Sequence, residues 1–71
     1  MISFEIDTEY IQLDKLLKVC RIAYSGGQAH DMVEQGIVKV NDITETRKRA
    51  KIRPGDKVQI GTEIIAVKPK K

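Results

Sequence analysis

A capped helix that runs directly into an alternating strand is the feature that most constrains this fold. Ser25 is a residue type that begins helices well, and Gln28 stands three positions later, at the spacing of a capping box. We expect the helix to end at Gly36, because glycine adopts the left-handed conformation that follows many helices. Residues 37–41 are β-branched and partly alternate, which predicts a strand with Lys39 on the face opposite its valine neighbours.

Two interpretations stay open for the first turn of this helix, where Gly26 and Gly27 carry no side chains. The backbone N–H groups of the turn could donate hydrogen bonds to an anion, helped by the helix dipole. Alternatively, the glycines only permit a tight turn after the preceding segment. The role of Gln28 also has two interpretations, since the hydrogen bonds of the capping box alone could occupy its side chain.

A cationic segment follows the strand. Asn41 and Asp42 tolerate left-handed backbone and predict a turn, and residues 45–53 then hold five basic side chains and one acidic one. The segment closes at residues 53–56, where proline and glycine stand as a type II turn requires. An extended path would send alternate side chains to opposite faces, whereas a looped path would gather them. The alternative function of such a segment is a solvated basic edge that prevents aggregation between sheets.

The rest of the chain supplies further short elements. Residues 2–6 alternate as a strand, and residues 13–20 carry a helical stripe of leucines. Residues 58–60 and 64–67 predict two more strands, and residues 68–71 a frayed tail. The order is a strand, two helices and then three or four strands. We therefore predict an α+β fold in which two short packed helices lie against a small, mainly antiparallel sheet, with residues 1–71 forming one domain.

The charge is segregated along the chain. Residues 1–14 hold four acidic side chains and no basic one, whereas residues 36–60 hold seven basic and three acidic side chains. The net charge of +3 therefore understates the local positive charge. This distribution favours a polyanionic partner, although many solvated surfaces are also basic.

No residues suggest an enzyme, a cofactor or a metal site. Cys20 is the only cysteine, which excludes an internal disulfide, and its place in the leucine stripe predicts a buried thiol. His30 is the only histidine, and together with Asp31, Glu34 and Gln35 it is expected to face away from the core. No apolar run has membrane-spanning length, and the acidic first residues are unlike a signal peptide, so we expect a cytoplasmic protein.

Four segments in order carry a family resemblance. Residues 13–18, 25–29, 36–41 and 53–56 resemble the αL RNA-binding motif. This is the S-four-like domain shared by a small-subunit ribosomal protein, pseudouridine synthases, tyrosyl-tRNA synthetases and a heat-shock ribosome-binding protein. The resemblance covers residues 11–67. The glycine pair and the run that begins at Glu45 are similar to the stand-alone bacterial members, which consist of little else.

The resemblance implies a set of RNA-facing residues on the helix pair and the adjoining turn. Carried over position by position, they are Lys15, Lys18, Arg21, Gln28, His30, Lys39, Asn41, Arg47, Lys48, Arg49 and Lys51.

Several of these residues also have structural interpretations. His30 stands where the family usually has lysine or arginine, so its charge depends on pH, and Asp42 stands where glycine is usual. Asn41 could simply form the turn. The basic residues of the first helix, Lys15, Lys18 and Arg21, could be ordinary solvent-facing side chains.

The leading hypothesis is a non-catalytic module that binds ribosomal or other structured RNA, including tRNA, as a monomer. The preference for RNA over DNA comes from the resemblance alone, and the small number of aromatic residues argues against stacking along a single strand. The second hypothesis is an adaptor whose basic strip meets an acidic protein surface. A third is a regulatory subunit that lends RNA affinity to a separately encoded enzyme.

Overall fold

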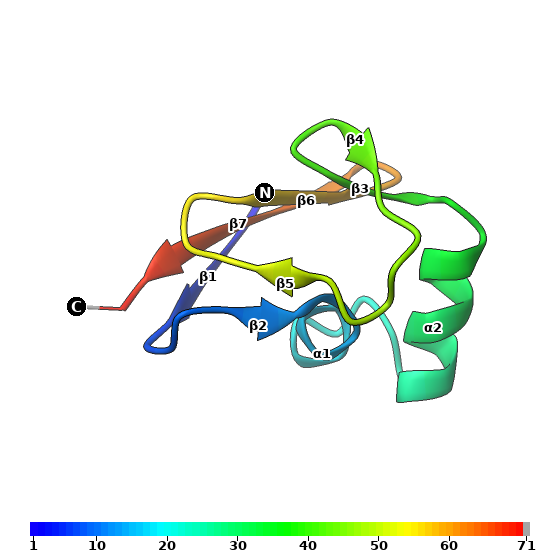
Figure 1. Cartoon of the computed structure of the whole chain (residues 1–71), viewed down its shortest axis with the longest axis horizontal. Helices are drawn as coiled ribbons and strands as arrows, with labels where there is room; N and C mark the ends of the chain where they lie inside the picture. Colours follow the sequence, from blue (N-terminus) through cyan, green and yellow to red (C-terminus); the bar gives the residue numbers. More distant parts are fainter. Residues whose placement is uncertain (71) are drawn as a thin grey trace.

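The computed structural model describes residues 1–70 and contains a five-stranded sheet, a two-stranded sheet and two helices (Figure 1). The elements in chain order are β1 (Ile2–Ile6), β2 (Ile11–Gln12), α1 (Leu13–Val19), α2 (Gly26–Glu34), β3 (Val38–Val40), β4 (Ile43–Thr44), β5 (Lys51–Ile52), β6 (Lys57–Ile60) and β7 (Glu63–Pro69). The large sheet has the order β1-β7-β6-β3-β4, and β2 pairs with β5 in the small one. Among the strands of residues 1–70, only the β1–β7 pair is parallel. The predicted α+β fold with a mainly antiparallel sheet is confirmed.

Both helices pack through leucine and small aliphatic side chains. Leu13, Leu16 and Leu17 of α1 have no exposed surface, which accounts for the stripe seen in the sequence. Ala29 and Val33 of α2 are equally buried against them. The sheet completes this core with Val38, Val58, Ile60, Ile65 and Val67.

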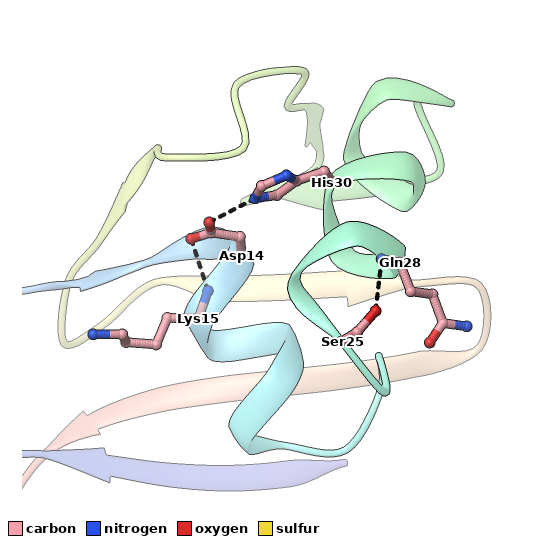
Figure 2. Close-up of polar contacts among 5 residues, drawn as sticks. All are labelled: Asp14, Lys15, Ser25, Gln28 and His30. Carbon is pink, nitrogen blue, oxygen red and sulfur yellow. Dashed lines mark hydrogen bonds and ion pairs between the residues drawn. The ribbon is translucent and has the colours of Figure 1, made fainter.

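The start of α2 confirms the N-cap and corrects half of the capping box. Ser25 Oγ accepts a hydrogen bond from the backbone N–H of Gln28 at 3.1 Å, as predicted (Figure 2). The side chain of Gln28 does not return to Ser25. Its Oε1 accepts the backbone N–H of Tyr24 at 2.6 Å, because the long side chain reaches one residue further back.

The left-handed positions expected from the sequence are present. Gly36 has a φ of 75° after α2, and Asn41 and Asp42 have φ values of 51° and 70° in the two-residue turn between β3 and β4. Positive φ at both central residues is the signature of a type I′ hairpin turn, whose twist matches that of the flanking strands. Gly55, with a φ of 100°, occupies the glycine position of the turn that ends the cationic segment.

One face of the large sheet packs on the helices, and the other is open. The strand registers place Lys39 beside Gln59 and Ile64, and Lys57 beside Ala66 and Ser3, on the face opposite the buried valines. We call this surface the open sheet face and define it by the side chains Ser3, Glu5, Lys39, Lys57, Gln59, Ile64 and Lys68.

Two expectations about the strands were wrong. Five strands follow the helices rather than three or four, because β4 and β5 have only two residues each and show no sequence period. The predicted tail begins as strand, since β7 continues to Pro69 beside β1 and the Lys70 N–H donates to the Ile6 carbonyl at 2.7 Å. Lys71, the end of that predicted tail, lies outside the described residues.

Candidate functional site

The cationic segment follows a looped path that is fastened to the start of α1. The N–H of Ala50 donates to the carbonyl of Arg47 at 3.1 Å and closes a turn. Leu13 and Asp14, at the start of α1, donate their backbone N–H groups to the carbonyls of Ala50 and Lys48, each at 2.9 Å. The first N–H groups of a helix lack partners within it. The segment therefore supplies acceptors for the first N–H groups of α1, and the same hydrogen bonds hold the segment against the helix (Figure 1).

The looped path gathers most of the cations of the segment. Arg47, Arg49, Lys51 and Arg53 line one surface hollow, together with Ala50 and Asp56. Lys48 lines the adjoining hollow with Thr46, the two neighbouring arginines and Glu34 of α2. Lys48 is absent from the first hollow but lies beside Arg47 and Arg49 in the second, so these two arginines connect the two hollows.

Two of these cations are held by neighbouring side chains. The guanidinium of Arg47 donates to both carboxylate oxygens of Glu45, with Nε–Oε2 at 3.2 Å and Nη2–Oε1 at 3.4 Å. The hydrogen bonds from Arg47 hold the pKa of Glu45 below its ordinary value. Lys51 Nζ lies 5.0 Å from the centroid of the Tyr10 ring, at the distance of a cation–π contact.

The α1 lysines line a separate hollow that borders the start of α1. Lys15 and Lys18 are exposed and line a hollow with Gln12, Asp14, Val19 and Gly26. Because the backbone N–H of Asp14 donates to the carbonyl of Lys48, this hollow adjoins the cationic segment. We call the combined area the helix–loop surface and define it by Lys15, Lys18, Arg47, Lys48, Arg49, Lys51 and Arg53.

His30 is less exposed than predicted. Its Nε2 lies 3.0 Å from Oδ2 of Asp14, and its side chain keeps 32% of its surface exposed (Figure 2). Asp14 Oδ1 accepts the N–H of Lys15 at 2.8 Å, so this carboxylate joins the two helices. Asp31, Glu34 and Gln35 face solvent as expected.

Arg21 and Gln28 lie at the connection between the helices. Arg21 is exposed and has a φ of 61° just after α1. The backbone of Gln28 donates to Ser25, and its side chain accepts from Tyr24, which supports the structural interpretation of this residue.

Lys39 and Asn41 do not join the helix–loop surface. Lys39 lies on the open sheet face, because the face that carries Val38 packs on the helices. Asn41 uses its side chain within the fold: Nδ2 donates to Asp56 Oδ1 at 3.0 Å, and Oδ1 accepts the Lys57 N–H at 3.0 Å. The residues transferred from the family therefore fall on two sides of the sheet.

Two residues of this region were absent from the sequence-based set. Arg53 lines the same hollow as Arg47, and its place in the basic run was a sufficient signal. Tyr24 precedes the N-cap of α2 and is 90% exposed, which no sequence pattern indicated.

Cys20 is half-buried beside the core, and burial raises the pKa of its thiol.

Residues 1–70 contain no group of three or more side chains arranged to hold a metal ion. Among the helices of this described part, neither has the length and apolar character needed to cross a membrane.

Comparison with solved structures defines the class of fold. The solution structure of YbcJ from E. coli, described as revealing an αL motif involved in RNA binding, superimposes with a TM-score of 0.74. The two are 35% identical, and the match covers 96% of this chain and 87% of that one. The chain thus has the αL fold that its sequence resembles.

Sequence comparison gives the family. The model described as the S4 domain matches residues 4–68, and the chain belongs to the S4 domain family. It is 40% identical over 55 residues to the probable ribosome maturation protein RlbA of Bacillus subtilis, covering 78% of each chain. It is 38% identical over 58 residues to the putative RNA-binding protein YbcJ of Escherichia coli, covering 82% of this chain and 83% of the relative.

Proposed function

We propose that the chain is a non-catalytic RNA-binding module that recognises structured RNA through the helix–loop surface. The observation that carries this proposal is the hollow lined by Arg47, Arg49, Lys51 and Arg53, on a segment fastened to α1. The relatives support RNA as the partner, since one is named a putative RNA-binding protein and another a probable ribosome maturation protein. The proposed ligand is ribosomal RNA and the proposed place of action is the cytoplasm; the name of the ribosome maturation relative supports a ribosomal ligand.

The chemistry of the surface suits a phosphate backbone. Arginine side chains bind phosphate oxygens in pairs, while lysines act as point charges. Cations that are already held in place lose less conformational freedom on binding. Since structured RNA is recognised largely through shape and backbone, a rigid cationic surface is an appropriate means of recognising it.

The test is the salt dependence of RNA binding. We expect purified ribosomal RNA to bind with a log Kd that rises linearly with log salt, at about 0.7–0.9 per phosphate contact. Anisotropy titrations of the monomeric chain at several potassium chloride concentrations give this slope directly. Absence of binding at low salt would contradict the proposal. If ribonuclease treatment of a cell extract left the captured partners unchanged, an acidic protein partner would be favoured instead.

A further inference from the structure

Tyr24 is the most exposed aromatic side chain of the described residues. Its exposed fraction is 90%, compared with 37% for Tyr10, whose ring already contacts Lys51. Phe4 packs partly on the core. Isolated exposed apolar side chains are common and need no explanation by themselves. The surroundings of Tyr24 are what distinguish it.

The backbone that carries Tyr24 is fixed on both sides. Its own N–H donates to Oε1 of Gln28 at 2.6 Å. Ala23, just before it, is 2% exposed and donates to the carbonyl of Leu17 at 3.1 Å. Ser25, just after it, caps α2. An aromatic ring presented from a fixed backbone binds a partner at low entropic cost.

A hollow bordered by cations begins two residues after Tyr24, at Gly26. Gly26, two residues after Tyr24, has no heavy atom within 4 Å of the position that a Cβ would occupy. It lines the same hollow as Lys15, Lys18 and Val19, and Val19 is itself 48% exposed. Apolar surface therefore lies next to lysine side chains at the end of the helix–loop surface.

We propose that Tyr24 is a stacking platform for one unpaired base, whose neighbouring phosphates are held by Lys18 and Lys15. This inference rests on the proposed function and narrows its ligand to structured RNA with an unpaired nucleotide in a loop or bulge. A base in a continuous duplex has both faces covered by its neighbours, so it cannot stack on a side chain without unpairing. A nucleotide fits better than a protein side chain because the apolar ring and the cations match a base joined to a phosphate.

The sequence contains no tryptophan, so Tyr24→Trp places a single fluorescent reporter at the site. The probes are an RNA hairpin with an unpaired loop and the same stem as a blunt, fully paired duplex. We expect the hairpin to quench the tryptophan and the duplex to leave its emission almost unchanged. We expect Tyr24→Ala to weaken hairpin binding from about 5-fold to about 150-fold, because stacking on one aromatic contributes about 1–3 kcal/mol per base. Tyr24→Phe should retain hairpin affinity.

Ile43→Ala is the matched control. It removes a 72% exposed apolar side chain from β4, away from the connection between the helices. This change should leave the affinities for the hairpin and for the duplex unaltered. Equal hairpin affinity for the unmodified chain and Tyr24→Ala would overturn the inference while leaving the proposed function intact. Hairpin binding to Tyr24→Trp without quenching of the tryptophan emission would also overturn the inference and leave the proposed function intact. If the unmodified chain bound neither RNA, both proposals would fail.

Discussion

The helix–loop surface and the open sheet face are both rich in basic side chains, yet they present charge differently. On the open sheet face, Lys39, Lys57 and Lys68 come from three different strands, and Glu5 lies beside Lys68 in the register. On the helix–loop surface, consecutive residues of one loop and neighbouring residues of α1 lie together. The path of the backbone, rather than the number of cations, therefore determines where a cationic surface forms.

The two surfaces also differ in the type of cation. All three cations of the open sheet face are lysines, whereas the helix–loop surface includes Arg47, Arg49 and Arg53. Guanidinium groups match paired phosphate oxygens, and the compact, strongly hydrated ammonium group does not. We therefore expect changes to the cations of the helix–loop surface to alter RNA binding, and equivalent changes on the open sheet face to leave it unaltered.

The largest expected effect is on the support of the helix–loop surface. Leu16→Ala removes a fully buried side chain from α1 and should lower the free energy of unfolding by about 2–5 kcal/mol. Urea denaturation followed by circular dichroism measures this loss. Val19→Ala, on the same helix but 48% exposed, is the control and should cost far less. Similar losses for the two variants would mean that α1 is not packed as described.

A smaller effect is expected at the cap of α2. Ser25→Ala removes the acceptor of the Gln28 N–H and should cost about 1 kcal/mol of stability. Its control is Ser3→Ala, which removes an exposed hydroxyl from the open sheet face and should leave the denaturation midpoint nearly unchanged. Equal midpoints for both variants would contradict the role of Ser25 in holding the helix.

The smallest effect concerns the pair of Glu45 and Arg47. Because hydrogen bonds from Arg47 lower the pKa of Glu45 in the folded chain, the ionised carboxylate favours the folded state. The contribution is present above the ordinary pKa of 4.5 and is lost as the pH falls through the lowered value. It should be smaller than the loss at Ser25, because the Arg47 side chain is 81% exposed and ion pairs with a solvated partner contribute little.

Denaturation midpoints of the unmodified chain and Glu45→Gln, compared at neutral and acidic pH, check this prediction. The two midpoints should differ at neutral pH and converge on acidification. Glu5→Gln provides a carboxylate control on the open sheet face, where no ion pair is found among residues 1–70. If the difference between the midpoints of the unmodified chain and Glu45→Gln widened at acidic pH, the ionised carboxylate of Glu45 would not stabilise the folded state.

Local patterns in the sequence were sufficient for much of the fold. The Ser25 cap, the left-handed Gly36 and the turn at Asn41 and Asp42 each depend on a few adjacent residues, and all three are confirmed. The short pair of β2 and β5 could not be predicted, because two-residue strands show no period and their pairing joins distant parts of the chain. Residues 68–69 were predicted as a tail because their strand structure comes from pairing with β1.

The candidate site was predictable in composition but not in geometry. The density of cations at residues 45–53 was visible in the sequence, whereas their gathering depends on the backbone bonds from Leu13 and Asp14. The alternation of residues 37–41 correctly predicted that Lys39 lies on the strand face opposite its valine neighbours. Only the structure shows that the helices cover the valine face and so separate Lys39 from the other cations.

The most direct test of the account compares two charge-matched triple variants in one RNA-binding assay. One variant replaces Arg47, Lys48 and Arg49 with alanine, and the other replaces Lys39, Lys57 and Lys68 with alanine, so that each loses three positive charges. We predict that the loop variant loses affinity for ribosomal RNA by at least about tenfold, with a salt slope lower by about two to three. The sheet variant should retain both its affinity and its slope. Equal losses in the two variants would show that net charge, rather than the helix–loop surface, determines binding.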